Sequence, residues 1–455
     1  TQGTTNDAPV GDGFKVTFAD NTDHLEIPQV TQAGWQVVGT SLGTFAYRVD
    51  NDAVTELNLL GNLGSSAYRF AGDLYGIILL PESATGKDIE DARKLLIDRG
   101  ASDGASGSSF FAAWYTRQDI VEFKPVDMSN VTNVQSAWNN TSLTNFPALD
   151  LSSSTSFYSA WGYCLNLVTM GAINAENGTN FSYAWSFCSA LTSFPSDALL
   201  GTAATNVNFS SAWRSSGLTS FNTPLPTATT LTSAWQSCTS LTSFSTELPT
   251  ATRVDYAWWG DNSLSDFRTT DIKNSTNFTS SWQNCSALTS FPADAKLGTE
   301  ASNVNFTSAW QNSGLTSFPA LDLSNGKNFV STFASCSNLT SLEAGVLFSA
   351  NANNIVFYLA FSNCTSLVDF PPAAFDSLGT PAASCFLDCW SGCAALSANS
   401  VENILVSINT SGKSAPSTNP QITIDYNVAT GSLSAATNTA IDSLSGKGWE
   451  VYING

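Results

Sequence analysis

Residues 181–194 read Phe-Ser-Tyr-Ala-Trp-Ser-Phe-Cys-Ser-Ala-Leu-Thr-Ser-Phe, and close variants of this phrase recur through most of the chain. Repetition at a short, nearly constant period is typical of a solenoid, in which each unit packs only on its neighbours. Twelve aromatic anchors occur at spacings of 22 to 29 residues: Trp114, Trp138, Trp161, Trp185, Trp213, Trp235, Trp258, Trp282, Trp310, Phe333, Phe361 and Trp390. This stretch therefore predicts the fold class.

The composition agrees with a solenoid that faces solvent. The 455 residues exceed the roughly 250–300 residues at which a single globular core stops growing, and a stacked array escapes that limit. Only 12% of residues are charged, against about 25% in an average protein. The surface must therefore be made polar by Ser, Thr and Asn.

The net charge of −20 excludes several partners. Nucleic acids and anionic membrane surfaces both require clustered Lys and Arg, so we expect neither as a partner. The longest apolar stretch, residues 75–80, is far shorter than the about 20 residues that span a bilayer, so we expect no membrane insertion. The acidity favours solubility, or a site for divalent cations.

The first residue is Thr1, with no initiator Met and no signal peptide. Two histories fit this start. The chain could be secreted and cleaved, or made in the cytosol and trimmed, as a virion component would be.

The repeat divides the chain into three expected domains. Residues 1–105 lack it, and their alternating patterns at 14–18 and 35–38 predict strands, whereas 88–99 predict a helix that ends at Gly100. This β-rich domain could cap the array, attach it to another body, or do both. Residues 102–109 are expected to form a turn or hinge that leads into the first unit.

The array spans residues 106–396. Within one unit, 191–194 predict a short strand, and 181–188 predict a turn of helix or an irregular arc. Residues 180–221 echo residues 277–318 at an offset of 97, which indicates duplication of a four-unit block.

Residues 397–455 predict an α/β cap, because the repeat ends there and the periodicity changes. Helices are expected at 401–408 and 435–444, and strands at 422–426 and 449–453.

One unit carries a clear resemblance. Residues 321–342, which read Leu-Asp-Leu-Ser-Asn and later Phe-Ala-Ser-Cys-Ser-Asn-Leu-Thr-Ser-Leu, resemble the BspA-like leucine-rich repeat. This resemblance implies an α/β repeat solenoid with short parallel strands. Such repeats occur in surface adhesins of bacteria and mycoplasmas and in structural proteins of marine tailed phages. The chain departs from them in using Trp at the anchor.

The flanks resemble phage-encoded versions of this family. The carriers are residues 88–102, residues 400–408 and the Gly-Lys-Gly-Trp at 446–449. The resemblance implies a virion surface protein, such as a fibre, spike or capsid appendage, with other virion structural proteins as partners and a possible homo-oligomer.

The regular Trp and Cys positions invite functional interpretations. The Trp side chains could form a sugar-stacking platform, but we expect them to fill the core with the aromatic residues four positions earlier, on one face of a helical turn. Seven cysteines follow the anchor by three residues and are expected to be core. Cys385, Cys389 and Cys393 suit one helical face and could seed a metal site, although no His or CxxC pair accompanies them.

Catalytic and cation sites have weaker signals. The only histidine is His24, so no His-based triad can exist in the array. Paired carboxylates could still cleave glycosides, and two sets of Asp residues occur. Residues 50–52 (Asp-Asn-Asp) could bind Ca²⁺ but lack the full loop pattern. The two sets are Asp150 with Asp322, in equivalent contexts, and Asp255, Asp261, Asp266 and Asp271, within one unit.

A recurring serine lies between Thr and Phe in the expected strands, and we expect these hydroxyls to form a row on one sheet face. The row is Ser193, Ser220, Ser243, Ser290 and Ser317. It could bind host-surface glycan or protein, or be merely solvated. The leading interpretation is a non-enzymatic virion surface protein for host attachment, with no cofactor and no metal. The alternatives are a bacterial cell-surface or secreted adhesin and a polysaccharide-degrading virion enzyme.

Overall fold

The computed structural model describes residues 110–123, 128–348, 352–426 and 432–454 in full, and only the backbone of residue 124 and of four strands before residue 110. The predicted helix at 88–99, the hinge at 102–109, His24 and the candidate Ca²⁺ ligands at 50–52 lie outside the described residues. The chain forms two compact units, one of residues 1–178 with 198–200 and one of residues 179–197 with 201–455.

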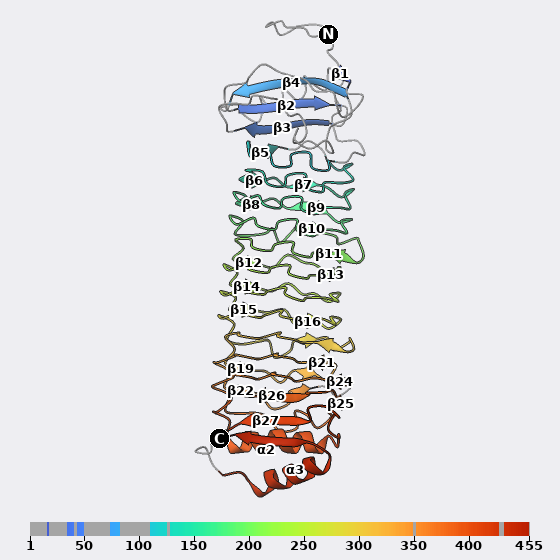
Figure 1. The fold of residues 1–455 in the computed structure, drawn as a ribbon. Helices are drawn as coiled ribbons and strands as arrows, with labels where there is room; N and C mark the ends of the chain where they lie inside the picture. Colours follow the sequence, from blue (N-terminus) through green and yellow to red (C-terminus); the bar gives the residue numbers. More distant parts are fainter. Residues whose placement is uncertain are drawn as a thin grey trace. The chain divides into compact units, whose positions relative to one another are not determined.

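The first unit contains a seven-stranded sheet in which the strand pairing changes from antiparallel to parallel (Figure 1). Its four N-terminal strands pair antiparallel, and the last of them in sheet order, β3, also pairs antiparallel with β5. From β5 onward the pairing is parallel. The strands in sheet order are β1 (Val16–Thr17), β4 (Asp73–Pro81), β2 (Gly34–Thr40), β3 (Gly43–Val49), β5 (Ile120–Lys124), β6 (Asn145–Phe146) and β8 (Thr169–Met170). Strands β1 and β2 fall on the predicted stretches 14–18 and 35–38.

In both units the repeats form columns of two- or three-residue parallel strands. One column carries the Ser-Phe pairs: β12 (Ser220–Phe221), β14 (Ser243–Phe244), β15 (Asp266–Phe267), β19 (Ser317–Phe318) and β22 (Ser341–Leu342). In the first unit, a second column contains β7 (Leu149–Asp150), β9 (Ile173–Ala175) and β10 (Leu199–Leu200). In the second unit, strands of the same kind are β16 (Asp271–Ile272), β17 (Lys296–Leu297), β20 (Asp322–Leu323) and β23 (Leu347–Phe348).

A third column precedes the anchors: β11 (Val207–Asn208), β13 (Ala228–Thr230), β18 (Val304–Asn305), β21 (Gly326–Asn328), β24 (Asn353–Ile355) and β25 (Thr380–Pro381). In the second unit, β12, β14 and β15 lie on the side opposite β13 and β16 (Figure 1). The parallel columns establish the predicted solenoid.

Each rung closes through an arc around its aromatic anchor, and this arc is not helical. The residues two before and two after every anchor have positive φ, for example 58° at Tyr183 and 62° at Phe187 around Trp185. Such values are unusual for bulky side chains. Of the two predicted alternatives, the irregular arc is confirmed and the turn of helix is wrong, because this alternation directs amides toward the next rung instead of along a helix. The N–H groups of Tyr183 and Phe187 donate to the carbonyls of Ser210 and Arg214 (2.9 and 2.7 Å).

The interior of the second unit is a file of stacked rings. Trp213 and Trp235 stack at 5.3 Å and 3°, and Phe221 and Phe244 stack beside them at 5.7 Å and 9°. Phe221 meets the Trp235 ring edge to face at 5.0 Å. Every anchor is buried, which confirms the Trp file as core and not as a sugar platform.

The four elements predicted for the C-terminal cap are present: α2 (Ala398–Thr410), β27 (Gln421–Asp425), α3 (Ala435–Gly446) and β28 (Glu450–Asn454). A further strand that was not predicted, β26 (Phe386–Trp390), precedes them. Strands β26, β27 and β28 form one parallel sheet. The side chain of Asp425 accepts the Gly392 N–H at 2.6 Å, and Ser400 of α2 accepts the Phe370 N–H at 2.8 Å. The cap thus satisfies amides of the final rungs.

Candidate functional site

The serine row lies on the exposed face of the first strand column. Ser220 pairs in register with Ser243, and Ser243 pairs with Asp266. The phenylalanines that follow these serines are buried, because successive side chains of a strand point to opposite faces. Ser220 is exposed and Ser243 is half-buried. Ser317 is half-buried and pairs with Ser341.

Two members of the row lie outside regular strands. Ser193 and Ser290 are exposed and occupy the equivalent segment, but the strand predicted at 191–194 does not form. The stacking beneath is looser there, since Phe194 and Phe221 lie 6.0 Å apart at a tilt of 32°. The Thr219 N–H donates to the Thr192 carbonyl at 2.9 Å, and this backbone bond joins the two segments in place of a strand ladder.

Threonines next to the serines have their hydroxyls engaged between rungs. The hydroxyl of Thr219 donates to the Thr192 carbonyl (3.1 Å) and that of Thr242 to the Thr219 carbonyl (2.9 Å). Thr340 repeats this contact with the carbonyl of Thr316 at 2.9 Å. In the described part of the chain no such contact involves the side chains of the five row serines, so their hydroxyls remain available to a ligand.

The cysteine file is structural. All nine cysteines are buried, and none of them forms a disulfide. Several donate to the carbonyl of the anchor in the preceding rung, as Cys238 does to Trp213 (3.0 Å) and Cys336 to Trp310 (2.9 Å). Burial raises the pKa of Cys164 and of Cys336 to about 11, which keeps these thiols protonated. This confirms the prediction that the file is core.

The helical face expected for Cys385, Cys389 and Cys393 is wrong, because Cys389 lies in β26. Cys393 instead donates to the Phe361 carbonyl at 3.0 Å. No group of three His, Cys, Asp or Glu side chains able to hold a metal ion occurs among the fully described residues.

The four acids of the unit around Trp258 are dispersed. Asp255 is buried and paired with Arg253 (3.0 Å), whereas Asp266 lies on the exposed strand face. Asp271 belongs to β16 in another column. Asp261 is fully buried at the position that cysteine holds in other rungs. They form no common site.

Asp261 has an unusual environment. One carboxylate oxygen accepts the Cys238 N–H at 2.8 Å, and the other, Oδ2, has no partner. Burial raises the pKa of Asp261 well above its usual value. The pKa values of the Cys238 and Cys285 thiols are raised first by burial and then by the Asp261 charge.

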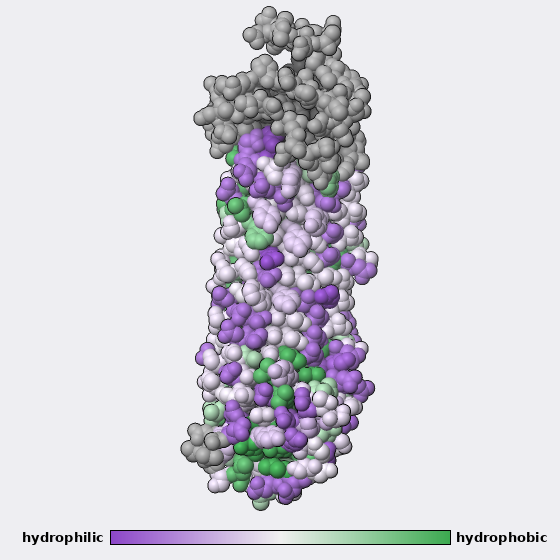
Figure 2. Space-filling model, viewed as in Figure 1, coloured by the Kyte–Doolittle hydropathy of each residue, from purple (hydrophilic) through white to green (hydrophobic). Residues whose placement is uncertain are grey.

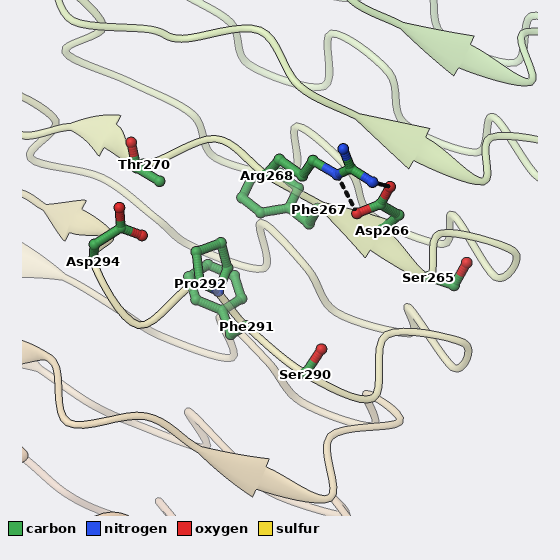
Figure 3. A pocket seen from close by; sticks show the side chains of 9 residues that line it. All are labelled: Ser265, Asp266, Phe267, Arg268, Thr270, Ser290, Phe291, Pro292 and Asp294. Carbon is green, nitrogen blue, oxygen red and sulfur yellow. Dashed lines mark hydrogen bonds and ion pairs between the residues drawn. The ribbon is translucent and has the colours of Figure 1, made fainter.

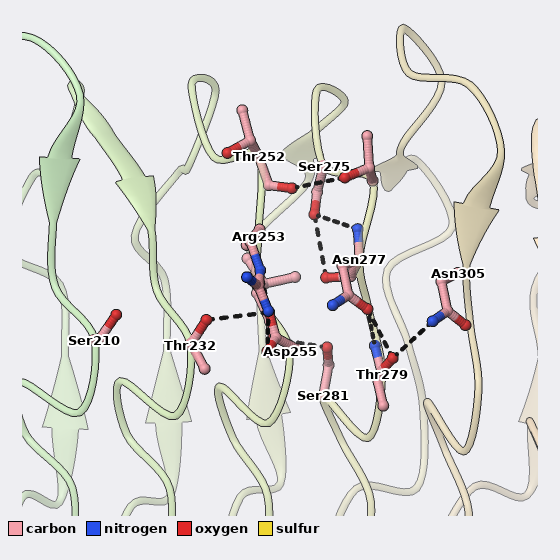
Figure 4. Close-up of polar contacts among 12 residues, drawn as sticks. Ser210, Thr232, Thr252, Arg253, Asp255, Ser275, Asn277, Thr279, Ser281 and Asn305 are labelled. Atoms are coloured by element: carbon pink, nitrogen blue, oxygen red, sulfur yellow. Dashed lines mark hydrogen bonds and ion pairs between the residues drawn. The ribbon is translucent and has the colours of Figure 1, made fainter.

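Arg253 and Asp255 replace an asparagine turn that other rungs use before the arc (Figure 4). In the next rung, Asn277 accepts the amide and the hydroxyl of Thr279 (3.1 and 2.7 Å). Here the carboxylate of Asp255 accepts from Arg253 and from Thr232 (3.1 Å) instead. The pair is therefore structural. Asp150 and Asp322 also cap turns, accepting the amides two residues later at 3.0 and 2.9 Å.

A hollow of about 320 Å³ interrupts the serine row between two rungs (Figure 3). Asp266 occupies the row position, and Arg268 follows it at the position where several other rungs carry Pro. Arg268 donates to Asp266 at 2.7 and 2.6 Å, and their side chains are 71% and 42% exposed. Ser290 and Asp294 of the following rung form the other side.

The apolar base of the hollow is formed by rings. Phe291 and Phe267 are 6% and 5% exposed, and Pro292 lies between Asp294 and Ser290 in the view of Figure 3. Neither Arg268 nor Asp294 stands out in the repeat pattern, so the sequence motifs did not predict them as site residues. The feature of the sequence that could have indicated this site is its local charge. Seven of the 21 residues from 253 to 273 are charged, whereas only 12% of the whole chain is charged.

The visible surface of the described residues is mostly pale or purple, with green in small patches (Figure 2). Such a face matches the Ser- and Thr-rich surface expected from the composition. No helix among the described residues is long and apolar enough to cross a bilayer.

Comparisons with known proteins give little beyond the fold. No family model and no curated protein matches the chain. It is similar to a leucine-rich repeat protein from Bacteroides ovatus, at 13% identity over 77% of this chain and 88% of the other, with a TM-score of 0.27.

A leucine-rich repeat protein from Eubacterium ventriosum is similar at 14% identity over 56% of this chain and 78% of the other, with a TM-score of 0.25. The rungs themselves, with their parallel strand columns, make the chain a parallel-strand solenoid.

Proposed function

We propose that this protein is a non-enzymatic attachment protein of a virion surface, and that its first strand column binds a host-surface glycan. The observation that carries the proposal is the contrast within the Thr-Ser pairs. The threonine hydroxyls bond between rungs, whereas the exposed serine hydroxyls beside them are left to solvent. A regular row of free hydroxyls suits the many hydroxyls of a polysaccharide, and many weak contacts add up through multivalency.

A binding role fits the carboxylates better than glycoside cleavage does. Hydrolysis needs two carboxylates facing one accessible bond. Asp255 and Asp261 are buried, and Asp266 is already engaged by Arg268. The low charge of the exposed surface also favours a neutral ligand.

The placement on a virion is supported by the flanks. Helix α2 and the Gly-Lys-Gly-Trp stretch at the junction of α3 and β28 carry the resemblance to phage-encoded proteins. In this proposal the N-terminal domain contacts other virion structural proteins and the array projects outward. Homo-oligomerisation would multiply the row.

The binding role is tested with the full chain and fluorescently labelled host surface polysaccharide. Replacing Ser220 and Ser243 together by Glu places two charges in the row and should weaken binding at least tenfold. The matched control replaces Ser240 and Ser337 by Glu, because both are exposed serines in the turns after an anchor. Equal loss in both double variants would contradict a role for the row.

The location is tested by mass spectrometry and immunogold labelling of purified particles. We expect the chain in stoichiometric amounts on the particle surface. Recovery in cell-envelope fractions, with none in particles, would favour the bacterial adhesin instead.

A further inference from the structure

We propose that the hollow between Asp266, Arg268 and Asp294 is a subsite that seats one non-acidic sugar residue of a glycan lying along the serine row. This inference rests on the proposed function and adds a place and a ligand class to it. The hollow lies on the row itself, since Asp266 pairs in register with Ser243 and Ser290 lines the opposite side.

The size and the lining of the hollow fit a sugar ring. Its volume of about 320 Å³ is at the lower end of the roughly 300–1,000 Å³ of small-molecule sites. A pyranose has an apolar C–H face and a rim of hydroxyls that both donate and accept. Pro292 and the edge of Phe291 supply an apolar base, and the surrounding side chains supply hydroxyls, a guanidinium and carboxylates.

The charges of the lining select against acidic sugars. Two carboxylates, Asp266 and Asp294, face one guanidinium, which gives the lining a net charge of −1. Both Nε and Nη2 of Arg268 are engaged by Asp266, so its charge is compensated. Glu247 adds a further carboxylate behind Thr270, whose amide it accepts at 3.0 Å. A uronic acid or sialic acid would therefore meet net repulsion.

A divalent cation is a poorer occupant than a sugar. The carboxylate of Asp266 is held by Arg268, which places a positive charge beside any metal bound there. Asp294 alone remains, and one carboxylate does not form the 6–8 oxygen shell of Ca²⁺.

The 97-residue duplication supplies a matched control. Asp197 occupies the loop equivalent to that of Asp294 and is likewise exposed. At the same offset of 97 residues, Thr169 and Gly171 stand where Asp266 and Arg268 stand. The segment that precedes the Asp197 loop therefore has no Asp-Arg pair. The two loops thus differ in the feature that defines the subsite.

The experiment measures binding of the full chain to immobilised galacto-, gluco- and manno-tetrasaccharides. Each is paired with the uronic acid tetrasaccharide of the same ring stereochemistry. We expect binding to at least one neutral member and at least tenfold weaker binding to its acidic partner. Asp294→Asn and Arg268→Gln should each weaken neutral binding about tenfold, because each removes a charged hydrogen-bonding group, whereas Asp197→Asn should leave it within twofold.

Each other outcome has a distinct meaning. Neutral binding that Asp294→Asn and Asp197→Asn affect equally would overturn the subsite and leave glycan attachment standing. Preference for the uronic acid members would also overturn it. Absence of binding to all these tetrasaccharides and to the host polysaccharide would overturn glycan attachment, and the subsite with it.

Discussion

The two sides of a rung, the arc around the aromatic anchor and the Ser-Phe strand face, follow opposite rules. In the arc, backbone amides donate to the next rung or within their own, and the anchors beneath are fully buried. On the strand face the ladders are two residues long, and the serines are exposed, as Ser220 is, or half-buried, as Ser243 is. Stability therefore resides in the arc, and the strand face is left free to vary for recognition.

The largest expected effect on stability comes from Trp235→Ala, which removes an anchor from the arc side of a rung. Trp235 stacks on Trp213 and Trp258 and is fully buried, so the change leaves a cavity and interrupts the file. We expect a loss of about 3–5 kcal/mol in the free energy of unfolding, measured by chemical denaturation. Trp235→Phe should cost much less, because Phe333 and Phe361 occupy the same position in other rungs. Equal losses for Ala and Phe would contradict stacking as the source of stability.

The next effect comes from Asp261, a carboxyl group buried in the cysteine file. Its raised pKa means that the folded chain keeps a proton that the unfolded chain releases near the usual value of about 4. The free energy of unfolding should therefore fall as the pH rises from that value to the pKa of the folded state, and then level off.

Asp261→Ser removes this pH dependence, because Ser216 and Ser313 hold the equivalent place in other rungs. The variant should be more stable than the wild type by about 1–3 kcal/mol at neutral pH, since it removes an unpartnered buried oxygen. Denaturation curves from pH 4 to 8 measure the difference. Exposed Asp294→Asn serves as control, and an unchanged slope in Asp261→Ser would refute the assignment.

A smaller effect tests the backbone of the arc. Asn312 has a φ of 55°, which Asn tolerates and a β-branched residue does not. Asn312→Val should destabilise by about 1–2 kcal/mol, in part through its lost bond to Asn284 (2.8 Å). Asn312→Gly loses the same side-chain hydrogen bond but keeps the backbone conformation. Its melting temperature, measured by thermal denaturation, should therefore be closer to that of the wild type than the melting temperature of Asn312→Val is.

The smallest expected effect is on the strand face. Ser243→Ala should change the free energy of unfolding by less than about 0.5 kcal/mol, because its hydroxyl holds no bond in the fold. The same variant should still weaken glycan binding measurably. A stability loss comparable to that of Asn312→Val would show that the row is part of the scaffold.

The repeat made the solenoid and its core predictable, because Trp and Cys recur at fixed offsets. The arc was not predictable from that spacing. A separation of four residues between Phe181 and Trp185 brings their rings together at 6.2 Å in the arc, as it would in a helix. The discriminating signal was the Asn or Gly two residues after several anchors, such as Asn140, Gly260 and Gly392.

The sequence named Asp266 and the row serine Ser290, but it did not predict that Asp266, Arg268 and Asp294 line one hollow. Sequence proximity groups the acids around Trp258, but a solenoid sends neighbouring residues to different sides of a rung. Asp261 and Asp266 are five residues apart, and one is in the core while the other is on the surface. The partner of Asp266 across the hollow, Asp294, comes from the following rung.

The arc has a consequence for how such a chain changes length during evolution. In the arcs of the second unit, amides on either side of the anchor donate to carbonyls of the following rung, so the internal edges of the arcs are alike. The final edge needs a special partner, which β27 and the Asp425 carboxylate provide. Whole rungs can therefore be inserted or lost without a new cap, and the likeness of residues 180–221 to residues 277–318 fits duplication of such a block.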